Sequence, residues 1–437
     1  MSKTFNRRQL LKTTGLVGAS WWVCRGLARG GSPNEKLDIA VVGVAGRGGD
    51  NLNGVAHENI VALCDVDSDR LGSAAVRFPL AKTYADFRVM LKEVTHQIDA
   101  VVVSTADHTH AVAGVAAMKA GKHCYCEKPM THNVYEARVM TELAKANNLA
   151  TQLGTQIHAG PNYRRAVELV QSGAIGPVGE VFVWLGANFD GPEKPQGVTQ
   201  PDAPTERPPV PPNLNWDLWL GPAPERPYHP AYAPFHWRNW WAFANGQLGD
   251  FFCHYCDLAF WALDLKYPTT VEAEGPVHPE SAARWTVARQ EYPARGDRPP
   301  VVLHWHNGGA WPAIVKERDV PRWNSGVLFV GTKGMLLADY GNHVLLPESQ
   351  YRDFERPQQT IPDSVGHHQE WINACKSDRK TTCGFDYSGP LTEAALLCNV
   401  ALRTGEKLTW NAHELKAVNC SAAEAFLRRE YRKAWTL

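Results

Sequence analysis

The chain has 437 residues, with 45 basic and 45 acidic side chains, and therefore no formal net charge. Apolar residues make up 44% and charged residues 21%, as in an ordinary soluble globular protein. Neutrality argues against nucleic acid as the main partner, because neutralising phosphates needs a surplus of Lys and Arg. No apolar run approaches the roughly 20 residues of a membrane-spanning helix. The length predicts two domains, each with its own core.

The N-terminal residues predict an export signal. Residues 6–12 contain the arginine pair Arg7-Arg8, a modestly apolar stretch follows, and small residues at 26–28 offer a cleavage site. We therefore expect a twin-arginine signal peptide and linker over residues 1–32, with the twin-arginine export machinery as a partner and a periplasmic location. Proteins on this route are exported folded, so a cofactor would be acquired in the cytoplasm. The alternatives are a disordered basic N-terminus and a lipoprotein modified at Cys24.

Residues 33–154 alternate apolar runs with helical periodicity. The apolar runs, each expected to be a buried strand, cover residues 37–44, 60–65, 98–104, 122–126 and 149–153. Helical spacing lies between them, at residues 84–93, 110–120 and 134–147. Apolar strands separated by helices indicate a parallel sheet covered on both faces, the doubly wound Rossmann α/β architecture. In this architecture ligands bind beyond the carboxyl ends of the strands.

A glycine-rich turn directly follows the first predicted strand. It fits the dinucleotide fingerprint G-x-G-x-x-G, except that Ala45 replaces the middle glycine. The expected cofactor contacts in this turn are Gly43, Ala45, Gly46, Arg47 and Gly48. Asp65 ends the second predicted strand, where a carboxylate would bind the adenosine ribose and repel a 2′-phosphate. These residues predict an NAD site rather than an NADP site; the alternative is an ordinary strand–helix turn.

Three further motifs follow in chain order. Residues 104–110 have the sequence Ser-Thr-Ala-Asp-His-Thr-His, residues 127–129 are Glu-Lys-Pro, and Asp250 precedes His254 by four residues. With the glycine turn, these motifs resemble the Gfo/Idh/MocA family of NAD(P)-dependent oxidoreductases, which act mainly on sugars, cyclitols and their derivatives. The resemblance extends from about residue 37 to about residue 415.

The resemblance implies roles for individual residues. In that family a Thr-Pro-x-x-x-His segment lies by the nicotinamide, and here Ala106 replaces its proline. The Glu-Lys-Pro motif carries the lysine of the active site. The implied cofactor contacts are Thr105, His110, Glu127 and Lys128, and the implied catalytic residues are Lys128, Asp250 and His254.

The catalytic candidates also suit alcohol oxidation on chemical grounds. Asp250 and His254 lie one turn apart on the predicted helix 248–263, so they project from one face. A carboxylate beside an imidazole fixes its tautomer and raises its basicity, which suits a general base near neutral pH. Lys128 supplies a positive charge that orients a hydroxyl group and stabilises a developing alkoxide. The alternative is that Asp250 and His254 form a surface or helix-capping pair and that Lys128 is solvated.

Residues 155–420 predict a second, α+β domain. A helical stretch at 160–172 precedes strand-like runs at residues 178–188, 269–273, 284–291, 301–307, 327–331 and 335–338. Long strands without intervening helices indicate a large, open, mostly antiparallel sheet. This domain is expected to bind substrate and, as in the resembled family, to join copies into a homo-oligomer, either a dimer or a tetramer. Residues 421–437 form a C-terminal tail.

A proline-rich insertion occupies residues 190–245. It has thirteen prolines before residue 235, followed by a dense group of aromatic residues. The aromatics favour an ordered, irregular strap laid over the sheet, rather than the disordered linker that such a composition usually forms. The candidate substrate contacts are Arg238, Trp240 and Trp241 in the strap, Tyr163 and Arg164 before it, and His368 after it.

The cysteines and histidines give no metal signal. Of ten cysteines, one lies in the predicted leader and nine lie beyond it. Cys253 and Cys256 form a C-x-x-C motif around His254, but no second ligand pair of suitable spacing accompanies it. We expect mostly free thiols and no metal site.

These observations favour an exported NAD-dependent oxidoreductase that oxidises a secondary hydroxyl group of a sugar or glycoside. Free NAD is scarce outside the cytoplasm, which favours NAD that stays bound between turnovers. The main alternative is an NAD-dependent glycosidase that works by transient oxidation, elimination, hydration and re-reduction. A third class, a catalytically silent sugar-binding protein, would keep the glycine turn without the lysine and histidine.

Overall fold

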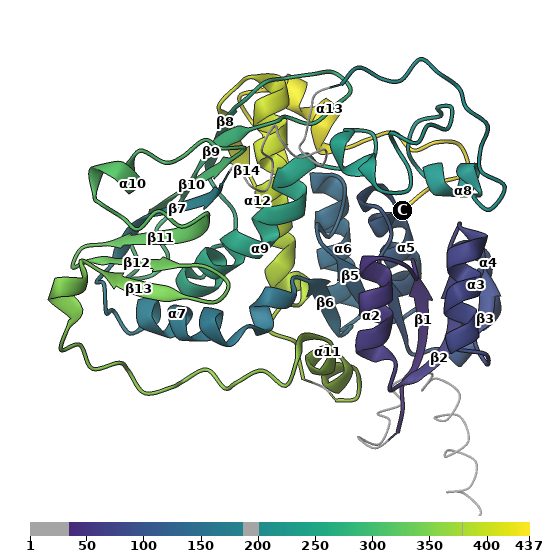
Figure 1. Ribbon diagram of the computed structural model, residues 1–437, viewed down its shortest axis with the longest axis horizontal. Helices are drawn as coiled ribbons and strands as arrows, with labels where there is room; N and C mark the ends of the chain where they lie inside the picture. Colours follow the sequence, from purple (N-terminus) through teal and green to yellow (C-terminus); the bar gives the residue numbers. More distant parts are fainter. Residues whose placement is uncertain (1–34, 187–200, 378) are drawn as a thin grey trace, which may run out of the picture. The chain divides into compact units, whose positions relative to one another are not determined.

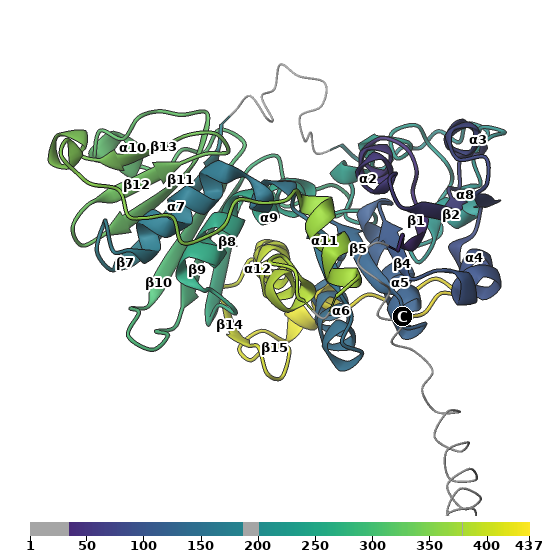
Figure 2. The ribbon, with the colours of Figure 1, turned by 90° about the horizontal axis from the view of Figure 1, so that it is seen from below.

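The computed structural model describes residues 35–186, 201–377 and 379–437. The predicted signal sequence, including Arg7, Arg8 and Cys24, lies outside these residues, as do residues 190–200 of the predicted strap. The chain from Lys36 onward makes one unit by its backbone contacts. Its architecture is shown in two perpendicular views (Figures 1 and 2).

Six parallel strands form the first sheet, in the order β3-β2-β1-β4-β5-β6 (Figure 1). They are β1 (Asp38–Val42), β2 (Asn59–Cys64), β3 (Lys82–Tyr84), β4 (Ala100–Val103), β5 (His123–Glu127) and β6 (Thr151–Gly154). The helices between them are α2 (Arg47–Val55), α3 (Ser68–Arg77), α4 (Phe87–Val94), α5 (Asp107–Lys119) and α6 (Val134–Ala146). The predicted doubly wound sheet is confirmed. The sequence missed β3, because its three residues form no apolar run.

The central strands are buried on both faces because nearly every residue in them is apolar. In β1 and β4, alternate side chains enter two separate cores, as the period of two in a strand requires. One core includes residues of α5 and α6, and the other includes residues of α2. Trp371 and Ile372 of α11 (His367–Cys375) complete the second core. The C-terminal part of the chain therefore covers one face of the first sheet.

Nine strands form the second sheet, in the order β13-β12-β11-β7-β10-β9-β8-β14-β15. They are β7 (Val178–Leu185), β8 (Thr270–Glu274), β9 (Thr286–Tyr292), β10 (Val301–Asn307), β11 (Ser325–Gly331), β12 (Met335–Ala338), β13 (His343–Leu346), β14 (Leu408–Asn411) and β15 (Lys416–Ala417). Only β7 and β10 pair in parallel among these strands. The predicted large, mostly antiparallel sheet is confirmed, although β13, β14 and β15 were not predicted.

Three helices pack against one another beside this sheet: α7 (Pro161–Gln171), α9 (Gly246–Leu263) and α12 (Phe385–Thr404). In Figure 2, α12 lies between the nine-stranded sheet and α6. One hydrophobic core consequently runs from the parallel sheet to the nine-stranded sheet. The remaining short helices are α8 (Trp216–Leu220), α10 (Ile314–Glu317) and α13 (Glu424–Leu427). Within the described ranges, none of the helices has the length and apolar character needed to cross a membrane.

The described part of the strap, residues 201–245, is ordered around an aromatic cluster. Trp216 and Trp219 stack with ring centroids 4.8 Å apart, and buried Tyr232, Trp240 and Phe243 pack beside them. The strap was expected to lie over the open sheet of the second domain. Instead, residues 213–219 contact the loops that follow β2 and β4 of the parallel sheet. Backbone hydrogen bonds hold the strap against the parallel sheet, and this position could not be predicted from the composition of the segment.

Candidate active site

The glycine turn between β1 and α2 permits a close approach of backbones. Gly43 has a φ of +84°, and a Cβ there would lie 2.5 Å from the carbonyl oxygen of Ser104. A Cβ on Gly48 would lie 2.1 Å from the carbonyl oxygen of Gly43. Gly46, with a φ of +56°, borders open space, and α2 begins directly after it without a side-chain cap. Free N–H groups of a helix N-terminus beside open space fit the pyrophosphate of a dinucleotide.

Asp65 joins this turn to the end of β2. Its Oδ2 accepts a hydrogen bond from the Val44 N–H at 3.0 Å, and its Oδ1 accepts one from the Asp67 N–H at 3.0 Å. Burial raises the pKa of Asp65, while these two backbone hydrogen bonds lower it. The carboxylate thus lies beside the glycine turn, where the sequence analysis expects the adenosine ribose. Arg47 and Ala45 also remain accessible in the turn.

Lys128 and Asp250 meet at the carboxyl end of β5, although they are 122 residues apart in the chain. The Lys128 Nζ donates to the backbone oxygen of Asp250 at 2.8 Å and also to the Asp250 Oδ1. The Arg238 Nε lies 3.6 Å from the same carboxylate oxygen. Burial raises the pKa of Asp250, but Lys128 and Arg238 outweigh it and hold that pKa below its usual range. Asp250 is therefore ionised and lies between two cations.

His254 lies one turn further along α9 and stays neutral. Burial, followed by the nearby Lys128 charge, lowers its pKa well below 6.5, while Asp250 raises it. Among the described residues, its buried Nδ1 has no hydrogen-bond partner. The sequence analysis expected the Asp250 carboxylate to orient this imidazole and make it more basic. The orientation was wrong, because the carboxylate bonds to Lys128 instead, but the Asp250 charge does raise the His254 pKa as expected.

Glu127, the residue before Lys128, accepts hydrogen bonds from two amide side chains. Its Oε1 accepts hydrogen bonds from the Asn51 Nδ2 at 2.9 Å and the Gln156 Nε2 at 2.7 Å. Burial raises the pKa of Glu127, and the Lys128 charge lowers it. His368 joins the same network, since its ring Nε2 lies 2.9 Å from the Asn51 Oδ1. Asn51 of α2 thus joins Glu127 and His368 in one hydrogen-bond network.

The His110 ring lies between two backbone carbonyl groups of the site. Its ring nitrogens lie 2.8 Å from the carbonyl oxygen of Pro129 and 3.0 Å from that of Thr105. Burial lowers its pKa, so the ring is neutral and donates to one carbonyl at a time. The imidazole ties the loop after β4 to the residue that follows Lys128. Thr105 itself is half-buried in that loop.

Asp107 is a site residue that the sequence analysis missed. Its side chain is buried, and burial raises its pKa to about 8, with Arg238, Asp250 and Lys128 also acting on it. A carboxyl group with a strongly perturbed pKa beside other charged groups marks a functional site. Asp107 is also the first residue of α5, where an acidic residue is common for electrostatic reasons. That ordinary position is why the pattern alone gave no signal.

The predicted substrate contacts divide into one site residue and several core residues. Arg238 lies at the catalytic group, stacked 4.0 Å over the ring of Trp237. Four others are buried, and each donates a hydrogen bond to a backbone carbonyl oxygen, although the Arg164 Nε has no partner among the described residues. They are Tyr163, Arg164, Trp240 and Trp241.

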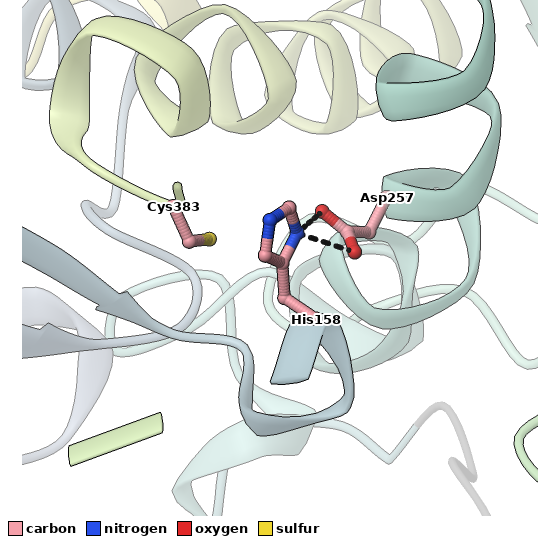
Figure 3. A group of neighbouring side chains, drawn as sticks. All are labelled: His158, Asp257 and Cys383. Carbon is pink, nitrogen blue, oxygen red and sulfur yellow. Dashed lines mark hydrogen bonds and ion pairs between the residues drawn. The ribbon is translucent and has the colours of Figure 1, made fainter. Parts of the chain in front are cut away.

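A second Asp–His group lies further along α9 (Figure 3). Both carboxylate oxygens of Asp257 lie 2.9 Å from the His158 Nδ1, and one accepts a hydrogen bond from the Tyr387 hydroxyl at 2.7 Å. The His158 ring stacks on Trp261 with centroids 4.0 Å apart. Its other edge faces Cys383.

This group forms a buried, hydrogen-bonded anchor between α9, α12 and the segment after β6. His158, Asp257 and Cys383 place potential ligand atoms within 4.8 Å of one another. Burial raises the pKa of the Cys383 thiol well above its ordinary value, so without a cation beside it the thiol stays protonated. The carboxylate already accepts two hydrogen bonds. The nine described cysteines, including Cys253 and Cys256, are free thiols.

Two family models match the chain, one in each of its two sheet-containing parts. Residues 37–155 match the Gfo/Idh/MocA model described as an oxidoreductase family with an NAD-binding Rossmann fold. Residues 162–307 match the model for a C-terminal alpha/beta domain of the same oxidoreductase family.

Two curated relatives share part of their length with the chain. The chain is 29% identical over 143 residues to myo-inositol 2-dehydrogenase of Thermotoga maritima, which covers 32% of the chain and 42% of that protein. It is 29% identical over 197 residues to a glycosyl hydrolase family 109 protein of Solibacter usitatus, which covers 40% of the chain and 44% of that protein. The alignments thus span less than half of the length of each relative.

A solved structure shares the fold over most of the chain. It is the WlbA dehydrogenase from Bordetella pertussis in complex with NADH and UDP-GlcNAcA. The TM-score is 0.60 at 16% sequence identity, covering 86% of this chain and 99% of that one.

Proposed function

The chain belongs to the Gfo/Idh/MocA oxidoreductase family, and from this premise we propose that it oxidises a secondary hydroxyl group of a sugar or glycoside by hydride transfer to NAD. NAD is the cofactor that its Rossmann domain binds. The observation that carries the proposal is the contact of Lys128 with Asp250 at the carboxyl end of β5, in the same sheet as the glycine turn. A dehydrogenase of a cyclic polyol among the relatives supports this substrate class.

Each residue of the site has a task in such a reaction. Bound NAD supplies the hydride acceptor. Lys128 donates a hydrogen bond to the substrate hydroxyl and stabilises negative charge that develops on its oxygen. Asp250 fixes the position of the Lys128 ammonium group, and Arg238 adds a second positive charge beside the carboxylate. His254, neutral because burial lowers its pKa, accepts the hydroxyl proton at a ring nitrogen.

A second candidate function is an NAD-dependent glycosidase, and the glycosyl hydrolase family 109 relative favours it. In that reaction the same residues would oxidise the sugar transiently. The oxidised sugar would eliminate its aglycone, add water, and take back the hydride. The net result is hydrolysis without a change in the redox state of NAD.

One experiment separates these two functions. The protein is purified as folded, its nucleotide content is measured by mass spectrometry, and it is incubated with a panel of free sugars and nitrophenyl glycosides. Stoichiometric formation of NADH supports the dehydrogenase. Repeated aglycone release without net NADH supports the glycosidase. Protein that neither contains nor binds NAD would contradict both proposed functions. Lys128→Met serves as the inactive control, because it removes the ammonium group that contacts the substrate oxygen.

We also propose that the protein is exported by the twin-arginine machinery and works in the periplasm as a homo-oligomer. Support for export comes from the consecutive residues Arg7 and Arg8 and the apolar stretch that follows. Residues 1–32 fused to a reporter should deliver it to the periplasm, and a double Arg7→Lys, Arg8→Lys variant should leave it inside the cell. Light scattering of the purified protein measures the number of subunits.

A further inference from the structure

A cavity of about 520 Å³ lies beside Asp65. This volume falls within the roughly 300–1,000 Å³ of typical small-molecule sites. One wall comes from the β2–α3 region and includes Val66 and Leu71, and the opposite wall comes from the strap between residues 210 and 216. The cavity therefore joins the Rossmann sheet to the insertion that the family resemblance does not explain.

The strap wall is fixed to the sheet by backbone pairing. The Ser68 N–H donates to the Asn213 carbonyl oxygen at 2.8 Å, and the Asn215 N–H donates to the Val66 carbonyl oxygen at 2.9 Å. These bonds flank an antiparallel bridge between Asp67 and Leu214. The Asn213 Nδ2 adds a hydrogen bond to the Asp67 Oδ1 at 3.0 Å. The wall is thus a short strand-like pairing with the loop that directly follows Asp65.

The strap is also fastened beyond the cavity. The His108 Nε2 lies 2.8 Å from the Trp219 carbonyl oxygen, which ties α8 to the start of α5. Arg432, near the C-terminus, donates to the Gly221 carbonyl oxygen at 3.0 Å and to Glu225 at 2.9 Å. Movement of residues 210–216 away from the sheet therefore requires several hydrogen bonds to break, or a local opening confined to those residues.

We propose that residues 210–216 of the strap form the outer wall of the adenosine site and retain NAD by enclosing its adenine in this cavity. The wall combines apolar side chains, such as Val210 and Leu214, with the polar groups of Asn213 and Asn215. A purine has apolar faces and a hydrogen-bonding edge, so this mixture suits it. Asp65, which binds the ribose, lies at the same cavity. The inference rests on the NAD site and not on the identity of the sugar.

The test measures how fast bound NAD leaves the protein. Full-length protein loaded with radiolabelled NAD is mixed with excess unlabelled NAD, and the retained label is followed over time. The double variant Asn213→Ala, Leu214→Ala should release NAD at least about tenfold faster, which corresponds to about 1.4 kcal/mol. Val277→Ala, at an exposed residue outside the cavity, is the matched control and should release NAD as the wild type does. If the double variant does not fold, Val210→Ala alone is used for the same measurement. This variant removes no side-chain hydrogen bond.

Nicotinamide mononucleotide, which lacks the adenosine, distinguishes the wall from the rest of the site. The strap variants should bind nicotinamide mononucleotide with the same affinity as the wild type. Unchanged NAD release in both Val210→Ala and the double variant would overturn the proposal, as would an equal loss of affinity for NAD and for the mononucleotide. Asp65→Ala separates the two kinds of failure. If it weakens NAD binding while the strap variants do not alter release, only the role of the strap is wrong. If it leaves NAD binding unchanged, the placement of the cofactor is wrong as well.

Discussion

Helix α9 carries two aspartates seven residues apart, and each lies near a histidine, yet their surroundings differ. The side chain of Asp250 is 24% exposed and bonds to Lys128, and the His254 Nδ1 has no hydrogen-bond partner within the described part of the chain. The side chain of Asp257 is fully buried, at 0% exposure, and bonds to His158 and Tyr387. The same residue types therefore lie beside a cation and near solvent in one place, and form a buried structural anchor among aromatic rings in the other.

The largest effect is expected from Lys128→Met. It should lower kcat/KM for the sugar by about 10²–10⁴-fold, because the developing negative charge on oxygen loses its hydrogen-bond donor. NAD binding should persist, since the glycine turn is untouched. Lys122→Met is the matched control, because Lys122 precedes the same strand at its other end and bonds to the Ile98 carbonyl oxygen. Steady-state kinetics on both variants check this, and equal losses in the two would contradict the role of Lys128.

His254→Ala should cause a comparable loss of turnover together with a changed pH profile. Burial lowers the His254 pKa below 6.5, so the wild-type base stays deprotonated at neutral pH and activity should fall only as the pH drops below that value. That acidic limb should disappear in the variant, whose residual rate uses water or hydroxide as the proton acceptor. Rates measured from pH 4.5 to 9 test this. An acidic limb that survives in His254→Ala would assign the proton acceptor to another residue.

Asp257→Asn should affect stability more than catalysis. The amide keeps one acceptor oxygen, but its NH2 group replaces a carboxylate oxygen that lies 2.9 Å from the His158 Nδ1, and a buried group left without a partner costs about 1–3 kcal/mol. Urea unfolding should show this loss, while turnover per folded molecule stays near that of the wild type. Asp250→Asn should show the reverse pattern. If Asp257→Asn is stable but inactive, the distinction between the two groups fails.

Asp107→Asn tests how burial acts on the carboxyl group that lies near Arg238, Asp250 and Lys128. Burial raises the Asp107 pKa from 3.8 to about 8, so between these pH values the folded protein retains a proton that the unfolded chain has released. The contribution of Asp107 to stability is therefore present at low pH and is lost as the pH rises through this window. Urea unfolding at pH 5 and pH 8 should show a wild type that weakens relative to the variant at the higher pH. Equal pH dependence in both proteins would contradict the buried state of the carboxyl group.

The sequence predicted those features that depend on local pattern. Apolar runs identified five of the six parallel strands, and the glycine positions identified the turn after β1, since each signal lies within a few consecutive residues. The short edge strand β3 and the strands β13–β15 gave no such run. A spacing of four placed Asp250 and His254 on one face of a helix but did not reveal which group the carboxylate bonds.

The remaining site features depend on contacts between distant segments. Lys128 reaches Asp250 from another part of the chain, so the carboxylate partner follows from the contact of the loop after β5 with α9. The side chains of Tyr163 and Trp240 are of types that suit a sugar site, but tertiary packing places both in the core. The position of the strap depends on backbone hydrogen bonds, which any residue except proline can donate. These features therefore required the structure.

The packing of α11 has a consequence for synthesis of the chain. His368 of α11 contacts Asn51 of α2 across 317 residues, and Trp371 completes a core that begins in β1. The first sheet leaves the ribosome long before α11 exists, so the part of its apolar face that α11 covers stays exposed during most of translation, whereas α2 covers the part beside it early. Contacts of such long sequence separation also slow folding. A fragment that ends before residue 367 should therefore leave exposed the part of this face around Tyr125, against which Trp371 packs.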